Sequence, residues 1–89
     1  MKKKISKEQI EDIVKEVISS QKGVKKESLS DDMDLQTDVN LDSLDIVEII
    51  MDLEDKFNIQ FKEDETFRFN TISQIIDYVE RKIKWDITK

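Results

Sequence analysis

The chain has 89 residues, of which 37% are hydrophobic and 40% carry a charge. This length allows one small domain, and the apolar residues recur regularly enough to form its core. The chain has no histidine and no cysteine, which excludes His-based triads, imidazole bases, disulfides and thiolate or imidazole metal sites. A single glycine, Gly23, cannot form a Gly-rich phosphate loop, so the composition argues against an independent enzyme.

Charge is unevenly distributed along the chain. Residues 1–30 carry eight lysines and five acids, whereas residues 31–65 carry thirteen acids and two lysines, within a net charge of −6. The acidic segment is either an ordinary solvated face or a surface that attracts basic proteins, and it disfavours nucleic acid as a partner. Lysines follow Met1, but no apolar segment of signal-peptide or membrane-spanning length comes after them. We therefore expect a cytoplasmic protein without membrane insertion.

The first predicted helix covers about residues 7–21. Ser6 and Gln9 form a capping-box pattern at its start, and Gly23 supplies a left-handed residue at its end. Residues 22–41 then lack a sustained hydrophobic period. A loop of this length is uncommon in a small domain, so it must be tied to the core by its scattered apolar residues or have a function of its own.

The second predicted helix has Asp42 as its N-cap and runs to about Lys56. It carries two apolar stripes, of which the broader one faces the expected core. The narrower stripe is flanked by acidic residues and consists of Leu44, Val47 and Met51. Because one helix of a small domain rarely needs two buried faces, this stripe is either buried as well or left exposed for a partner.

A short helical turn is predicted at residues 63–69, and a last helix begins near Thr71, where Thr71 and Gln74 form a second capping-box pattern. We expect a single domain over residues 1–89, with a structured core at about 5–84 and a tail at 85–89. The residues at the centres of the main apolar faces should be buried: Ile13, Val17, Ile50, Leu53, Ile76 and Val79. The fold class is therefore all-α, a four-helix arrangement of three longer helices, one short helix and a long first loop.

The acidic loop invites comparison with a calcium-binding loop. Its alternating oxygen-bearing residues are Asp32, Asp34, Gln36, Asp38 and Asn40. A twelve-residue calcium pattern that starts at Asp32 places Thr37 where glycine is required and Ser43 where a bidentate glutamate is required. No dedicated metal site is predicted.

Ser43 is the first residue of the predicted second helix and directly follows the long loop. A hydroxyl there is exposed, and a phosphate ester attached to it would meet the free backbone N–H groups of the first helical turn. An isolated Asp-Ser pair would be an ordinary helix start. Here it occurs together with a long loop, a second apolar stripe and an acidic helix.

One stretch of the chain reads Asp38-Val39-Asn40-Leu41-Asp42-Ser43-Leu44-Asp45 and is followed by Val47-Glu48, Met51, Leu53-Glu54 and Phe57. This pattern resembles the acyl carrier protein family. The resemblance extends over nearly the whole chain, since Gly23-Val24 matches the turn after the family's first helix and residues 71–79 match its last helix. It implies an all-α four-helix bundle of acyl-carrier type.

The resemblance also implies a cofactor. A separate transferase would move 4′-phosphopantetheine from coenzyme A onto a serine, which is Ser43 by position, with Asp42 and Leu44 beside it. The terminal thiol of the arm would carry an acyl chain as a thioester. This fits a chain that has no thiol of its own.

The partners implied are a phosphopantetheinyl transferase and acyl synthases or transferases of fatty-acid or polyketide synthesis, which dock on a monomer through basic patches. The acidic contacts would be Asp42, Asp45, Glu48 and Glu54, and the apolar contacts would be Leu44, Val47 and Met51. Two alternatives stay open. One is a carrier of aminoacyl or peptidyl groups, including D-alanyl, and the other is an unmodified helical interaction module.

The chain departs from the family pattern at a few positions. Asn40 stands where glycine is usual, and because asparagine tolerates a positive φ, the turn can be kept. Leu41 stands where a small residue is usual and is expected to add bulk beside the attachment site. Ile46 replaces a small polar residue, and Phe67 and Phe69 make the third-helix region aromatic. These departures bear on which pathway the carrier serves.

Overall fold

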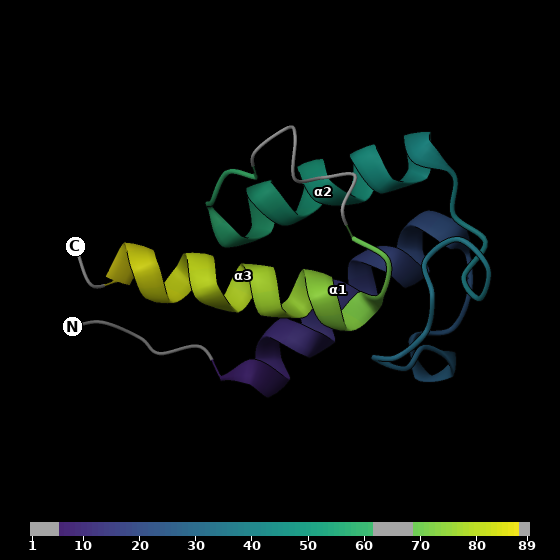
Figure 1. The fold of residues 1–89 in the computed structure, drawn as a ribbon, viewed down its shortest axis with the longest axis horizontal. Coiled ribbons are helices and arrows are strands. Elements are labelled where there is room, and N and C mark those ends of the chain that lie inside the picture. Colours follow the sequence, from purple (N-terminus) through teal and green to yellow (C-terminus); the bar gives the residue numbers. More distant parts are fainter. Residues whose placement is uncertain (1–5, 62–68, 88–89) are drawn as a thin grey trace.

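The computed structural model describes residues 6–61 and 69–87. Its α-helices are α1 (Lys7–Lys22), α2 (Ser43–Phe57) and α3 (Ile72–Ile87), and a short 3-10 helix, η1 (Lys26–Ser28), follows α1 (Figure 1). The described residues form no β-strand, and the predicted all-α class is confirmed. Nearly all of the short helix predicted at residues 63–69 lies outside the described residues.

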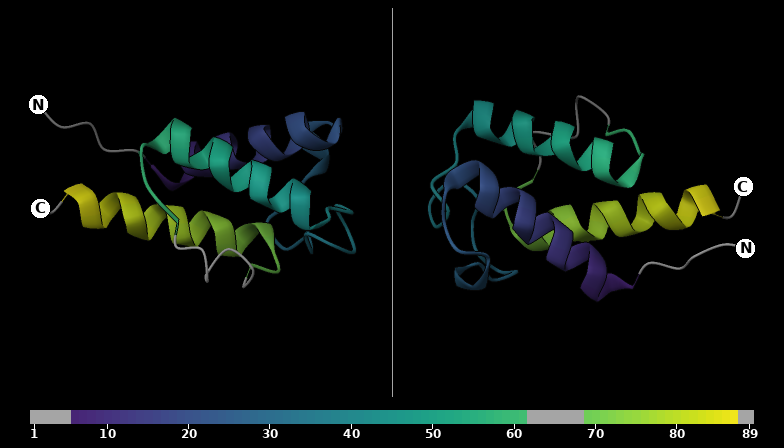
Figure 2. Two further views of the ribbon diagram at one scale, coloured as in Figure 1. Left: turned by 90° about the horizontal axis from the view of Figure 1, so that it is seen from above. Right: turned by 180° about the vertical axis from the view of Figure 1, so that it is seen from behind.

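Helix α1 packs against both α2 and α3, and seen from behind it lies across them (Figure 2). The long loop joins η1 to α2 at one end of the molecule. No helix in the described part of the chain is long and apolar enough to cross a membrane.

Side-chain caps define the helix starts that the sequence predicts. Ser6 Oγ accepts from Gln9 N at 3.1 Å, and Gln9 Oε1 accepts from Ser6 N at 2.9 Å, which completes the capping box of α1. Thr71 and Gln74 make the equivalent pair of bonds at α3, at 3.3 and 3.2 Å. Helix α1 ends at Gly23, whose φ of 78° is the left-handed value that glycine adopts without strain.

The last helix is longer than the hydrophobic pattern indicates. The sequence pattern predicts that the structured core ends at about residue 84, whereas α3 continues to Ile87. No glycine or proline stands between Ile83 and Ile87, so the backbone can keep its helical hydrogen bonds there.

The long loop is tied to the start of α3 and to the core. Leu35 N donates to Asn70 O at 2.8 Å, and Ser73 N donates to Asp31 O at 2.8 Å. Lys15 Nζ, on α1, lies 3.0 Å from Asp31 Oδ1. The loop also buries four apolar side chains, namely Leu29, Leu35, Val39 and Leu41. Of the two alternatives that the sequence left for this loop, anchoring by its apolar residues is confirmed.

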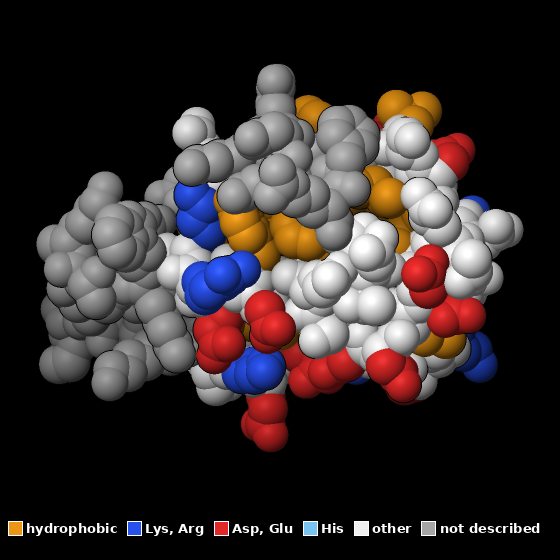
Figure 3. Space-filling view, in the orientation of Figure 1, with side chains coloured by type: hydrophobic (Ala, Val, Ile, Leu, Met, Phe, Trp, Pro, Cys, Tyr) orange, Lys and Arg blue, Asp and Glu red, His pale blue; other side chains and the backbone are white. Residues whose placement is uncertain are grey.

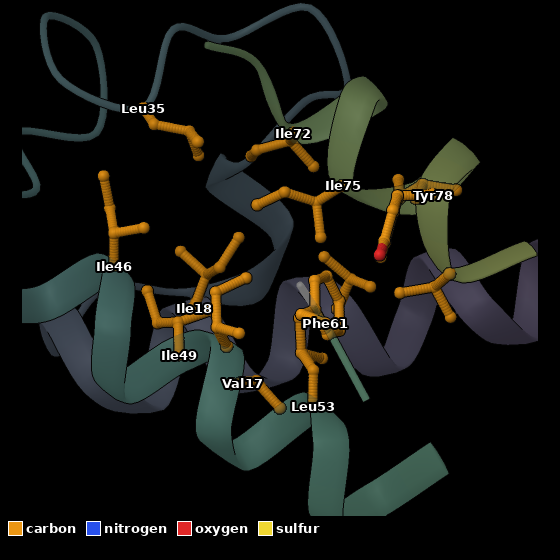
Figure 4. Packing of buried hydrophobic residues seen from close by; sticks show 14 of the residues in the cluster. Val17, Ile18, Leu35, Ile46, Ile49, Leu53, Phe61, Ile72, Ile75 and Tyr78 are labelled. Atoms are coloured by element: carbon orange, nitrogen blue, oxygen red, sulfur yellow. The ribbon is translucent and has the colours of Figure 1, made fainter. Parts of the chain in front are cut away.

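The core lies between the three helices and the loop (Figure 4). Five of the six residues expected at its centre are buried: Val17, Ile50, Leu53, Ile76 and Val79. The sixth expectation is wrong, because Ile13 is only partly buried. The buried face of α1 is centred on Val14, between Ile10 and Ile18, and at 3.6 residues per turn Ile13 falls at its margin.

Candidate functional site

Ser43 is the first residue of α2, as predicted, and it is exposed. Asp42 is the N-cap: its Oδ1 accepts from Asp45 N at 2.8 Å, while Asp45 Oδ2 accepts from Asp42 N at 3.2 Å. This capping box fixes the direction in which α2 begins. The backbone N–H groups of Ser43 and Leu44, which belong to the first turn, have no intrahelical acceptor.

The chain enters this helix through a left-handed turn at Asn40, whose φ is 68°. Asparagine therefore keeps the turn for which the family uses glycine, as the sequence analysis predicts. The turn lets both neighbours, Val39 and Leu41, enter the core. The expected bulk of Leu41 beside Ser43 is thus wrong, since Leu41 N donates to Leu35 O at 2.9 Å and its side chain is buried.

The second apolar stripe of α2 is exposed. Leu44 is 66% exposed, Met51 61% and Val47 36%, whereas Ile46 and Leu53 on the opposite face are buried. Leu44 directly follows Ser43, so the stripe begins at the candidate attachment site. An exposed apolar stripe of this kind, rimmed by charges, is typical of a protein-binding surface.

Carboxylates border this stripe on both sides. On the side of α1, the Gln21 side-chain amide donates to Asp45 Oδ1 at 3.5 Å and to Glu48 Oε1. The backbone N–H of Asp42 holds the pKa of Asp45 below its usual value of 3.8, with smaller contributions from Gln21 and Lys22.

On the other side of the stripe, Glu54 is half-buried, and its Oε2 accepts from Phe61 N at 2.8 Å. This contact joins the last turn of α2 to the segment that follows it. Neither this role of Glu54 nor the contacts of Gln21 is predicted by the sequence pattern. Asn58, which ends α2 with a φ of 56°, was the available signal that the chain folds back onto the helix.

Acids of the long loop accept hydrogen bonds from its backbone. Asp34 Oδ1 accepts from Gln36 N at 2.8 Å and from Thr37 N at 2.9 Å, and Asp38 Oδ2 accepts from Asp34 N at 2.8 Å. Acidic side chains lie over the end of the molecule that the loop forms and also along its lower edge in this view (Figure 3). Within residues 6–61 and 69–87, no group of three or more carboxylates is placed to hold a metal ion.

Comparisons with known proteins agree with this geometry. Residues 12–79 match the family model described as "Phosphopantetheine attachment site". The acyl carrier protein of Chlorobium phaeobacteroides is 36% identical over 74 residues, which cover 83% of this chain and 95% of that protein. The acyl carrier protein of Buchnera aphidicola subsp. Acyrthosiphon pisum is 36% identical over 73 residues, which cover 82% of this chain and 91% of that protein.

A solved structure of an acyl carrier protein from Enterococcus faecalis has the same fold. Its TM-score is 0.73 at 22% sequence identity, and the match covers 88% of this chain and 99% of that one. The family model and the relatives together show that the chain belongs to the acyl carrier protein family, whose members carry 4′-phosphopantetheine as a covalent group.

The residues of the site fit this prosthetic group. Ser43 offers an exposed hydroxyl, and the N–H groups of Ser43 and Leu44, which have no acceptor within the helix and lie at the positive end of the α2 dipole, suit a phosphate ester. The chain has no cysteine, so a thiol must come from the cofactor.

Proposed function

We propose that Ser43 is the attachment site of 4′-phosphopantetheine and that the chain holds acyl intermediates for the enzymes of fatty-acid or polyketide synthesis. The observation that supports this most directly is the exposure of Ser43 at the first residue of α2, inside the segment that matches the family model. When bound, the cofactor supplies a thiol on a flexible arm, to which an acyl chain can be joined as a thioester.

The chain's own residues serve attachment and recognition. Asp42 fixes the start of α2 through its bond to Asp45, which keeps the Ser43 hydroxyl at the surface. Beside it, the docking surface consists of Leu44, Val47 and Met51 with the carboxylates of Asp45, Glu48 and Glu54. Apolar contact supplies affinity, while the carboxylates steer a basic partner toward the site.

The partners that fit this surface are a phosphopantetheinyl transferase and acyl synthases or transferases with basic patches. In this proposal the chain itself performs no catalysis, because the reactive thiol belongs to the cofactor and the chemistry belongs to the partners. The carrier acts as a cytoplasmic monomer, with residues 1–89 as one domain.

The test is modification by a transferase. The protein is incubated with coenzyme A and a phosphopantetheinyl transferase and is then measured by intact mass. The wild type and a control variant, Ser20→Ala, on the exposed side of α1, should gain one prosthetic group, whereas Ser43→Ala should gain none. Modification of Ser43→Ala would show that the site assignment is wrong. Loading the modified protein with an acyl or an aminoacyl donor then distinguishes the two classes of carrier by mass.

A further inference from the structure

Gln21 links α1 to the acidic side of α2. It is exposed on the last turn of α1, and its amide nitrogen donates to Asp45 Oδ1 at 3.5 Å and to Glu48 Oε1. The two carboxylates belong to consecutive turns of α2, directly after Ser43. One neutral amide of α1 therefore contacts two negative groups of α2.

Two carboxylates three residues apart on a helix repel each other. The amide of glutamine offers two N–H donors, one for each carboxylate, and it carries no charge. Gln21 therefore brings the two acids together without cancelling either charge. A lysine at the same position would neutralise part of their charge.

Asp45 is held from a second direction as well. Its Oδ2 accepts from Asp42 N at 3.2 Å, so the two oxygens of its carboxylate have separate partners. None of the ion pairs between described residues involves Asp45 or Glu48. Gln21 thus contacts both acids, and neither of their charges is used in an ion pair between described residues, so both remain for an external cation.

We propose that Gln21 is a positioning residue for docking, which holds the carboxylates of Asp45 and Glu48 together to receive an arginine of the partner enzyme. The proposal rests on the proposed function, in which α2 is the docking surface. An arginine guanidinium suits the pair because its planar fork presents several N–H donors to carboxylate oxygens. Side chains that are ordered before the encounter lose less conformational entropy when the partner binds.

The experiment uses Gln21→Met, which keeps the length of the side chain and removes its donors. Gln36→Met, at an exposed position of the long loop, is the matched control. The rate of modification by the transferase is measured against the concentration of the carrier, together with the melting temperature. We expect KM to rise about three- to tenfold for Gln21→Met, with kcat and the melting temperature unchanged. The control should match the wild type.

A second background isolates the positioning effect. When Asp45→Asn and Glu48→Gln are already present, Gln21→Met should raise KM no further, because the charges it positions are gone. An equal rise of KM in both backgrounds, or an unchanged KM for Gln21→Met alone, would overturn the proposal. Failure of the wild type to be modified, or modification of Ser43→Ala, would instead overturn the proposed attachment site.

Discussion

Glu54 stabilises the connection that follows α2, although it stands among carboxylates that face solvent. Its Oε2 accepts from the backbone N–H of Phe61 at 2.8 Å. Phe61 is buried, and its ring centroid lies 4.7 Å from that of Tyr78 on α3. The hydrogen bond therefore holds the segment after α2 in the position from which Phe61 contacts Tyr78 on α3.

Replacing Glu54 with alanine leaves the N–H of Phe61 without its acceptor. We expect Glu54→Ala to lower the free energy of unfolding by about 1–3 kcal/mol, the usual cost of an unsatisfied buried donor. Asp55→Ala removes the same charge from an exposed neighbour and should change the free energy of unfolding by less than about 0.5 kcal/mol. Urea unfolding of the three proteins measures the difference, and equal effects of the two substitutions would refute the role of Glu54.

Asp34 makes the contribution of the long loop to the stability of the fold depend on pH. The backbone N–H groups of Thr37 and Gln36 bond its carboxylate and hold its pKa below the ordinary value of 3.8. A carboxyl whose pKa is lower in the folded state stabilises the fold above its unfolded pKa. That contribution disappears as the pH falls through the folded pKa.

Asp34→Asn removes the charge and keeps a similar shape. We expect this variant to be less stable than the wild type at neutral pH and to approach the wild type as the pH falls below 3.8. The comparison with the variant cancels the titration of the other acids. Urea unfolding at a series of pH values measures this difference, and a constant difference across the series would show that the Asp34 charge does not stabilise the turn.

Helix α2 has two apolar faces with different tasks. Leu53 is 0% exposed, while Met51, two residues earlier, is 61% exposed. Truncation of a buried leucine removes packing contacts and leaves a cavity, so Leu53→Ala should cost about 2–5 kcal/mol of unfolding free energy. Met51→Ala should leave the melting temperature almost unchanged and weaken docking of the transferase. Thermal unfolding and partner affinity of both variants test the assignment. A similar fall of the melting temperature in the two variants would contradict it.

The elements that the sequence predicts well depend on contacts within a few residues. The two capping boxes predicted from the sequence, at Ser6 and Thr71, join positions three residues apart, so the pattern of side chains contains the whole interaction. The same holds for the start of α2 at Asp42 and for the left-handed turn at Asn40. For the second apolar stripe of α2 the sequence left burial and exposure both open, and the structure shows Met51 exposed.

The features that the sequence does not predict join distant segments. Leu35 N bonds Asn70 O, and Gln21 bonds Glu48, so each pairing depends on how the helices pack. The burial of Leu41 depends on the turn before it, and the partial exposure of Ile13 depends on where α2 and α3 meet α1. No local periodicity contains this information.

The distribution of charge is a property of the whole molecule. Helix α2 carries five acids and one lysine, and its N-cap is a further aspartate. None of the ion pairs between described residues uses a carboxylate of α2, whereas lysines of α1 and η1 pair with acids elsewhere. The acids of α2 therefore repel one another in the folded protein, which lowers its stability and leaves a negative surface for a partner.

Salt should change stability and docking in opposite directions. Moderate salt or millimolar Mg²⁺ screens the repulsion within the acidic surface, so the melting temperature should rise. The same ions screen the attraction between this surface and a basic partner, so the affinity for the transferase should fall.

Charge reversal on α2 distinguishes the effect of the acidic surface on docking from the effect of the net charge. Glu48→Lys should weaken binding of the transferase and reduce its dependence on salt, with the fold intact or slightly more stable, because one repulsive group is gone. Glu27→Lys makes the same change of net charge at an exposed position of η1 and should weaken binding less. The measurement is a titration of affinity against ionic strength, with melting curves in the same buffers. An affinity that does not change with salt, or that falls equally for both variants, would mean that the acids of α2 form a solvated face and do not guide the partner to Ser43.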